Sequence, residues 1–148
     1  MLEWLFDSPL RVGTEAPDFT LQDQDGNAHT LSKLRGSNVV LVFYPADETT
    51  TCRKQLCEFR DRAKLTASKD TVVFGVNPQS AESHSKFRNN QRLTFPLLVD
   101  AGKRVASLYN CGGPLIRRTV YLIGKSGRIR FGERGKPVPE EVLQAAEL

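Results

Sequence analysis

Three cysteines carry the most distinctive chemistry in this chain. Cys52 follows a buried-strand pattern and a short polar loop, at the expected start of a helix. The free N–H groups and the positive dipole end of a helix favour a thiolate at that position. Arg53 and Lys54 add positive charge beside it. Because the flanking threonines and basic residues differ from a core environment, the sequence indicates a reactive thiol rather than a buried, inert one.

Cys57 lies five residues after Cys52, within the same predicted helix. In an intact helix that spacing separates the two Cα atoms by about 8–9 Å, whereas a disulfide needs about 4.4–6.8 Å. Cys57 is therefore either a partner that Cys52 reaches after the helix unwinds locally, or a core residue beside Leu56 and Phe59. Next to a reactive Cys52, the partner interpretation is favoured.

A metal site is the main alternative for these thiols. Cys52, Cys57 and Cys111 supply three sulfurs, and His84 or His29 would complete a set of four ligands. The spacing argues against it, because structural zinc sites use close pairs and Cys111 has no close partner. The chain also lacks the Cys-x-x-Cys pattern of thiol–disulfide oxidoreductases. We expect both histidines to be solvated, one in a hairpin and one on a polar helix.

The elements that must position Cys52 can be predicted from the hydrophobic pattern. Continuous apolar, β-branched runs over residues 38–44 and 71–76 predict buried strands of a parallel sheet. The other expected elements are hairpins over 19–31 and 119–131, a short strand over 97–100, and helices over 51–67, 80–90, 101–109 and 139–148. This order predicts an α/β, thioredoxin-like fold with a mixed central sheet flanked by helices and an extra amino-terminal hairpin.

This arrangement places Cys52 at the carboxyl end of the first central strand, where ligands bind in open α/β sheets. Within the helix that follows, we expect Leu56, Phe59, Ala63 and Ala67 to form the buried face. Residues 2–6 have the spacing of a short apolar helical face, which Pro9 would end.

Length and composition limit the remaining possibilities. A chain of 148 residues predicts a single domain over residues 1–148. Its apolar runs are too short for a membrane helix, and its acidic start differs from a secretory signal. The net charge of +4 comes from scattered basic residues, so we expect no nucleic-acid partner. An odd number of cysteines is typical of reduced thiols in a cytoplasmic protein.

Residues 45–52 match a specific motif. Pro45-Ala-Asp-Glu-Thr49-Thr-Thr-Cys52 resembles the Pro-x-x-x-Thr-x-x-Cys motif of peroxiredoxins. The spacing of Cys57 resembles the bacterioferritin-comigratory, or peroxiredoxin Q, subfamily, where the resolving cysteine lies five positions after the peroxidatic one. Residues 13–21, 95–100 and 118–127 are also similar to the family, so the resemblance covers about residues 13–135.

The resemblance implies a thioredoxin fold and thiol-dependent reduction of hydroperoxides. In this family pattern the Cys52 thiolate attacks the peroxide and becomes a sulfenic acid, Thr49 hydrogen-bonds the peroxide, and Arg118 keeps the thiolate ionised. Pro45 shapes the pocket, and Cys57 condenses with the sulfenic acid after the helix unwinds. The resemblance also implies a thioredoxin-like dithiol reductant, no metal or organic cofactor, and a monomer.

Several departures and alternatives accompany the resemblance. Thr50-Thr51 replaces the Pro-Gly of many relatives, which suggests a less rigid loop, and Gly124 replaces a frequent aspartate. Arg117 adjoins Arg118, so the choice of arginine depends on strand register. Cys111 lies outside the motif and is interpreted as structural, with a resolving role as the alternative. A disulfide reductase and a zinc- or partner-binding domain are the alternative functions.

Overall fold

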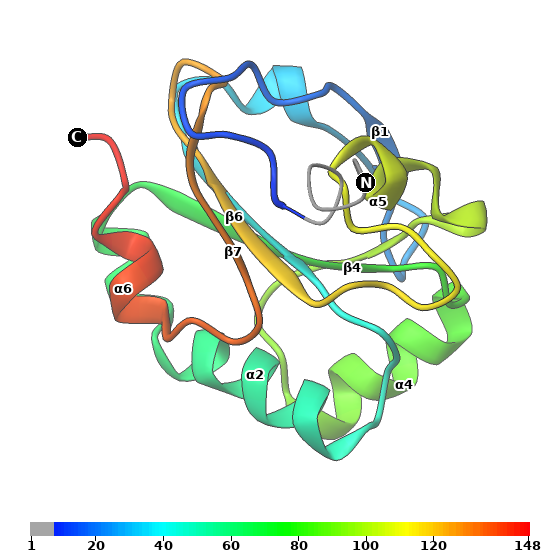
Figure 1. Cartoon of the computed structure of the whole chain (residues 1–148). Helices are drawn as coiled ribbons and strands as arrows, with labels where there is room; N and C mark the ends of the chain where they lie inside the picture. The colour runs from blue at the N-terminus through cyan, green and yellow to red at the C-terminus, as the bar shows by residue number, and fades with distance from the viewer. Residues whose placement is uncertain (1–7) are drawn as a thin grey trace.

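Five strands form one mixed sheet at the centre of the protein. The computed structural model describes residues 8–148, and Figure 1 shows the sheet between two layers of helices and loops. The spatial order is β5-β4-β3-β6-β7. Their bounds are β3 (Asn38–Phe43), β4 (Thr71–Asn77), β5 (Leu97–Val99), β6 (Thr119–Ile123) and β7 (Ile129–Arg134). β3, β4 and β5 are parallel, whereas β6 runs antiparallel to both β3 and β7.

The central strand β3 explains why the sheet is covered on both faces. Every one of its residues is buried. Successive side chains of a strand point to opposite faces, and the core divides accordingly. Val40 and Val42 belong to one apolar cluster, whereas Val39, Leu41 and Phe43 belong to the other. The continuous apolar run in the sequence therefore serves two cores.

Helices α2 (Thr50–Asp61), α4 (Ala81–Gln91) and α6 (Pro139–Leu143) cover the first face, at the bottom of Figure 1. Their inward side chains include Leu56, Phe59, Phe87, Val142 and Leu143, which pack with Val40 and Val42. Ser80 is the N-cap of α4, and its side chain accepts a hydrogen bond from Ser83 N, as the sequence predicted.

The second face is covered by the amino-terminal hairpin and by α5 (Arg104–Leu108), at the top of Figure 1. The hairpin pairs β1 (Thr20–Gln22) with β2 (Ala28–Thr30). It also closes the β5 edge, because Leu97 N donates to Gln24 Oε1 at 2.9 Å. Two 3₁₀ helices, η1 (Leu31–Leu34) and η2 (Ala101–Lys103), complete the layer. The predicted fold, with its extra hairpin, is confirmed.

Three predicted helices differ in detail. The helix expected over 51–67 divides at Arg62 (φ −107°, ψ 25°) into α2 and α3 (Ala63–Ser68). This break turns α3, so Ala63 and Ala67 are exposed, and Thr66 is buried instead. Gly102 (φ 76°) separates η2 from α5, and the last helix ends at Leu143. The apolar face expected over residues 2–6 lies outside the described residues.

Candidate active site

Cys52 lies in the first turn of α2, at the end of the loop that leaves β3. Its side chain is fully buried, and its backbone N donates to Thr49 Oγ1 at 3.4 Å. Thr49 is thus the N-cap of α2, with an extended backbone (φ −76°, ψ 149°). The same hydroxyl lies 3.4 Å from the carbonyl of Ala46, to which it donates. These contacts place a thiol beside the free N–H groups of a helix start.

Arg118 is the cationic partner of this thiol. Its Nη2 atom lies 3.2 Å from Cys52 Sγ. The register of the sheet explains the contact, since Thr119 on β6 pairs with Phe43 at the end of β3. Arg118 therefore lies next to the loop that carries Cys52, whereas its neighbour Arg117 is exposed. The arginine named by the family resemblance is the one that the sheet register brings to the sulfur.

Gln55 is a site residue that the sequence analysis did not identify. It is 2% exposed, and its Oε1 accepts from Arg118 Nη1 at 2.8 Å. Its Nε2 donates to the Gly135 carbonyl at 3.3 Å. Three residues after Cys52, it lies on the same face of α2. A glutamine at that spacing on the buried face of a helix is the signal that would have identified it.

Pro45 begins the loop between β3 and α2 and is half-buried. Having no N–H, a proline ends the ladder of β3 without leaving an unpaired donor. The loop continues through Asp47, which is 7% exposed as a whole residue, to Thr49 and the start of α2. Pro45, Thr49, Cys52 and Arg118 thus surround one end of the central strand.

The structure contradicts the expectation that both histidines are solvated. The side chain of His84 is fully buried, and its Nδ1 lies 2.7 Å from Asp47 Oδ2. His29 keeps 24% of its side chain exposed and pairs with Asp23 at 2.7 Å. The His84 prediction was wrong because Asp47, 37 positions away, supplies a carboxylate partner that permits burial. His29 is half-buried against Asp23, six positions away in the same hairpin.

Cys57 does not contact Cys52 in this structure. Both residues belong to the intact helix α2, and all three cysteines are free thiols. Cys57 is half-buried, with its Sγ 3.7 Å from Gln91 Oε1 on α4. It lines a hollow of about 260 Å³ together with Thr50, Arg53, Lys54 and Gln91. A Cys52–Cys57 disulfide therefore requires part of α2 to unwind.

Cys111 lies on the other face of the sheet. It belongs to the apolar cluster of Tyr109 and Tyr121, whereas Cys52 belongs to the cluster on the α2 side. Its Sγ donates to the Tyr109 carbonyl at 3.2 Å, and burial raises the pKa of the Cys111 thiol. Since β3 and its neighbours separate the two sulfurs, the structure does not assemble the three-cysteine metal site. Among residues 8–148, no group of three or more His, Cys, Asp or Glu side chains is placed to hold a metal ion.

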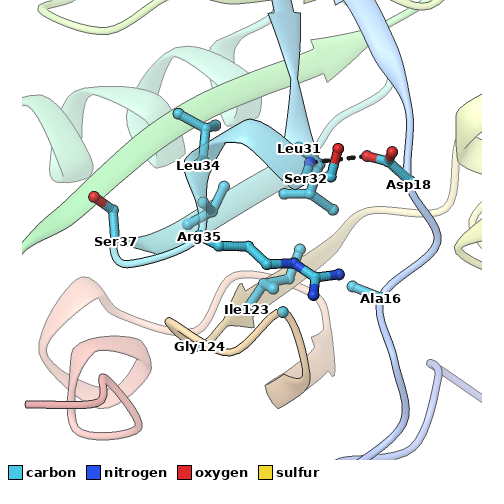
Figure 2. Close-up of a pocket in the computed structure, with 11 residues that line it drawn as sticks. Ala16, Asp18, Leu31, Ser32, Leu34, Arg35, Ser37, Ile123 and Gly124 are labelled. Atoms are coloured by element: carbon cyan, nitrogen blue, oxygen red, sulfur yellow. Dashed lines mark hydrogen bonds between the residues drawn. The ribbon is translucent and has the colours of Figure 1, made fainter.

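A small pocket also lies on that second face. Ala16, Leu31, Arg35 and Ile123 are among the residues that line it, and Figure 2 shows the Arg35 side chain reaching across it toward Ala16. Its volume is about 10 Å³, which is space for about one water molecule. It is too small for a ligand and lies away from Cys52.

Comparison with known proteins agrees with this geometry. The AhpC/TSA family model matches residues 12–131. The chain is 39% identical over 133 residues to the chloroplastic peroxiredoxin Q of Oryza sativa subsp. japonica, covering 87% of this chain. It spans only 61% of the length of that relative. It is 35% identical over 147 residues to peroxiredoxin Bcp of Bacillus subtilis (strain 168), covering 93% of this chain and 94% of the relative.

Solved structures show the same relationship. Peroxidoxin BcpB of Mycobacterium tuberculosis superposes with a TM-score of 0.85 at 30% identity, covering 92% of this chain and 96% of that one. A mutant PrxQ of Xylella fastidiosa superposes with a TM-score of 0.85 at 28% identity, covering 91% and 94%. With the motif of residues 45–52 and an arginine at the sulfur, these matches show that the chain belongs to the AhpC/TSA family, among the peroxiredoxins of the Q and Bcp type.

Proposed function

We propose that this protein is a thiol-dependent peroxidase that reduces hydrogen peroxide and organic hydroperoxides. The observation that carries the proposal is the guanidinium of Arg118, 3.2 Å from Cys52 Sγ in the capped first turn of α2. A buried sulfur beside a fixed cation and free N–H groups is suited to react as a thiolate. In the proposed reaction, Cys52 is the peroxidatic cysteine.

In the first step the Cys52 thiolate attacks one peroxide oxygen and the O–O bond breaks. The sulfur becomes a sulfenic acid, and the departing oxygen takes a proton and leaves as water or an alcohol. Arg118 stabilises the negative charge that develops on that oxygen. Thr49 offers its hydroxyl to the peroxide, and Pro45 limits the access of water to the pocket.

In the second step Cys57 acts as the resolving cysteine. Its thiolate attacks the sulfur of the sulfenic acid, an S–S bond forms, and water leaves. The first turns of α2 must unwind for this step, because the intact helix keeps the two sulfurs apart. The hydrogen bond from Cys57 to Gln91 is broken in the same movement.

A dithiol protein of the thioredoxin type then reduces the disulfide by exchange and becomes oxidised itself. A monomeric state and a cytoplasmic location stay predictions. Within residues 8–148 no helix is long and apolar enough to cross a membrane. The rice relative named above is chloroplastic, so the compartment is best determined by localisation of the protein itself.

The test is to mix fully reduced protein with one equivalent of hydrogen peroxide and to map the product by intact mass and peptide analysis. We expect a loss of two hydrogens with a Cys52–Cys57 link. Cys57→Ser should instead gain one oxygen at Cys52, and Cys52→Ser should not react. Cys111→Ser is the matched control and should form the same link as the unmodified protein.

Three outcomes would contradict the proposal. A link through Cys111 would assign the resolving step to the other face of the sheet. No modification at Cys52 would favour a general thiol–disulfide oxidoreductase. Bound zinc with silent thiols would favour a non-catalytic binding domain.

A further inference from the structure

A buried ion pair ties the loop between β3 and α2 to helix α4. Asp47 lies in that loop, and its carboxylate Oδ2 is 2.7 Å from His84 Nδ1. The Asp47 side chain is 1% exposed and the His84 side chain is 0% exposed. Burying two charged groups is costly unless each is paired and hydrogen-bonded. Neither residue has a role in the steps described above.

The Asp47 carboxylate is fully surrounded by donors. Oδ1 accepts from Tyr44 Oη at 2.6 Å and from Asn77 Nδ2 at 3.2 Å. Oδ2 accepts from Ser83 Oγ at 2.7 Å, in addition to His84. Burial by itself would raise the pKa of Asp47, but the hydrogen bonds from His84 and Tyr44 outweigh it and hold that pKa below its usual value. The carboxylate is thus the stable form.

The surroundings of His84 determine its protonation. Its Nε2 lies 2.9 Å from the Leu98 carbonyl, which can only accept a hydrogen bond. Its Nδ1 faces the Asp47 carboxylate, which also only accepts. Both ring nitrogens must therefore carry hydrogen, and the ring is an imidazolium that bridges the loop and β5.

This ion pair acts on the segment that leads into the active site. Asp47 N donates to Gln79 Oε1 at 2.5 Å, and Asn90 Nδ2 donates to Glu48 Oε2 at 2.8 Å. Glu48 has a left-handed backbone (φ 66°), which a residue other than glycine keeps only where its surroundings hold it. The next residue, Thr49, is the N-cap of α2, and it caps the turn that carries Cys52.

We propose that Asp47 and His84 are positioning residues for the peroxide step. Their ion pair, called the anchor below, holds the loop so that Thr49 and Cys52 stay in position beside Arg118. This inference rests on the proposed peroxidase function. The anchor precedes the part of α2 that must unwind for Cys57 to reach Cys52. The resolving step therefore does not depend on it.

The test measures the two steps separately. In the Cys57→Ser background, the rate of sulfenic acid formation is measured by competition with a peroxidase of known rate. We expect His84→Phe and Asp47→Ala to lower that rate by about 10- to 100-fold, because misplacement of reacting groups has effects of this size. With Cys57 present, the rate of disulfide formation from the sulfenic acid should change by less than about twofold.

Asp47→Asn is the conservative variant. A neutral His84 can accept from its amide and still donate to the Leu98 carbonyl, so the connection survives without charge. The peroxide step should stay within about threefold of the Cys57→Ser parent. The ¹⁵N signals of the His84 ring should change from imidazolium to neutral. His29→Phe is the matched control, since it breaks the other His–Asp pair on the distant hairpin, and it should leave the rate unchanged.

The outcomes separate this inference from the proposed function. If the Cys57→Ser parent forms no sulfenic acid, the proposed function fails. If it does so, and folded His84→Phe or Asp47→Ala reacts at the parent rate, the positioning role is wrong. An equal slowing of both steps would also overturn it. If both variants fail to fold, Ser83→Ala is the test, because it removes one hydrogen-bond donor from the Asp47 carboxylate. We expect the rate of the peroxide step to fall about threefold. An unchanged rate would reject the anchor.

Discussion

At the scale of single residues, the proposed reactivity of Cys52 rests on one charged contact with a buried sulfur. Arg118 Nη2 lies 3.2 Å from the sulfur, and the sulfur has no exposed surface. Hydrogen bonds to ionised groups are about twice as strong as neutral ones, and burial reduces screening by water. Gln55 fixes the guanidinium from its other side. The geometry therefore favours the ionised sulfur through a single positioned side chain.

Removing that side chain is the first prediction. In a Cys57→Ser, Cys111→Ser background, Arg118→Ala removes the cation that lies 3.2 Å from the sulfur. We expect the rate of the peroxide step to fall about 10²- to 10³-fold, the usual effect of losing one oxyanion donor. Competition kinetics against a peroxidase of known rate measure this effect.

Arg117→Ala is the matched control, because Arg117 is exposed and Arg118 is the residue at the sulfur. Its rate of the peroxide step should stay within about twofold of the parent. Arg118→Lys keeps the charge without the planar fork and should fall between the two. If Arg117→Ala lost activity and Arg118→Ala did not, the peroxide step would depend on Arg117, and the assignment of Arg118 would be wrong.

Residues of the site differ in how far sequence could predict them. Cys52, Thr49, Pro45 and Arg118 lie in motifs of fixed spacing, so the resemblance named them. The environment of His84 could not be found in the same way, because Asp47 is 37 positions away. A polar helix looks solvated until the loop that packs on it is known. Partners of this kind follow from the tertiary structure rather than from local pattern.

At the scale of elements, α2 must serve two incompatible geometries. Its first turn holds Cys52 buried beside Arg118, whereas a Cys52–Cys57 link requires those turns to open. Thr50 and Thr51 have low helix propensity, which reduces the cost of opening. At the other end, Arg60 Nη1 donates to the Gln91 carbonyl at 2.6 Å and ties α2 to α4. The break at Arg62 separates this segment from α3, so opening need not spread.

The second prediction concerns this opening. When the protein is oxidised with one equivalent of hydrogen peroxide, amides of residues 50–57 should lose protection against hydrogen exchange. Amides of α3 and α4 should keep theirs, because the tie at Gln91 and the break at Arg62 confine the change. Exchange measured by mass spectrometry on the reduced and oxidised forms tests this.

The Cys57→Ser variant treated in the same way is the control, since it cannot form the link and should retain protection over residues 50–57. A mapped Cys52–Cys57 disulfide with unchanged protection over those residues would be inconsistent with the geometry of an α-helix.

Elements of this fold were predictable where burial dictates a continuous pattern. Strands β3 and β4 were found within one residue of their ends, because a strand covered on both faces is apolar throughout. The division of the helix at Arg62 was not predicted, because the residues around it lack the glycine or proline that usually ends a helix. The exposure of Ala63 and Ala67 follows from that unexpected break.

At the scale of the whole molecule, the sheet separates two apolar clusters with different chemistry. The α2 face holds Cys52, with Cys57 packed against the same cluster. The hairpin face holds Cys111 with Tyr109 and Tyr121. Tyr109 Oη donates to the Pro17 carbonyl at 2.6 Å, and Tyr121 Oη donates to the Tyr109 carbonyl at 2.5 Å. This second cluster stabilises the fold while its tyrosine and cysteine side chains are neutral.

The last prediction follows from that neutrality. Burial raises the pKa of Tyr109, Tyr121 and Cys111, whereas in the unfolded chain tyrosine and cysteine ionise near their ordinary values of about 10 and 9. Above those values the unfolded state has released protons that the folded state still holds. Below about pH 9 these groups should leave the free energy of unfolding unchanged. As the pH rises further, it should fall by up to about 1.4 kcal/mol per pH unit for each such group.

Urea unfolding from about pH 8 to about pH 11 under reducing conditions measures this slope. Tyr109→Phe should lower the free energy of unfolding by about 1 kcal/mol at pH 8, because the hydrogen bond to Pro17 is lost. Its slope above about pH 10 should be shallower than that of the unmodified protein by one ionising group. Cys111→Ala should flatten the curve already from about pH 9. Parallel curves for all three proteins would mean that these groups ionise alike in the folded and unfolded states. That outcome would contradict the prediction.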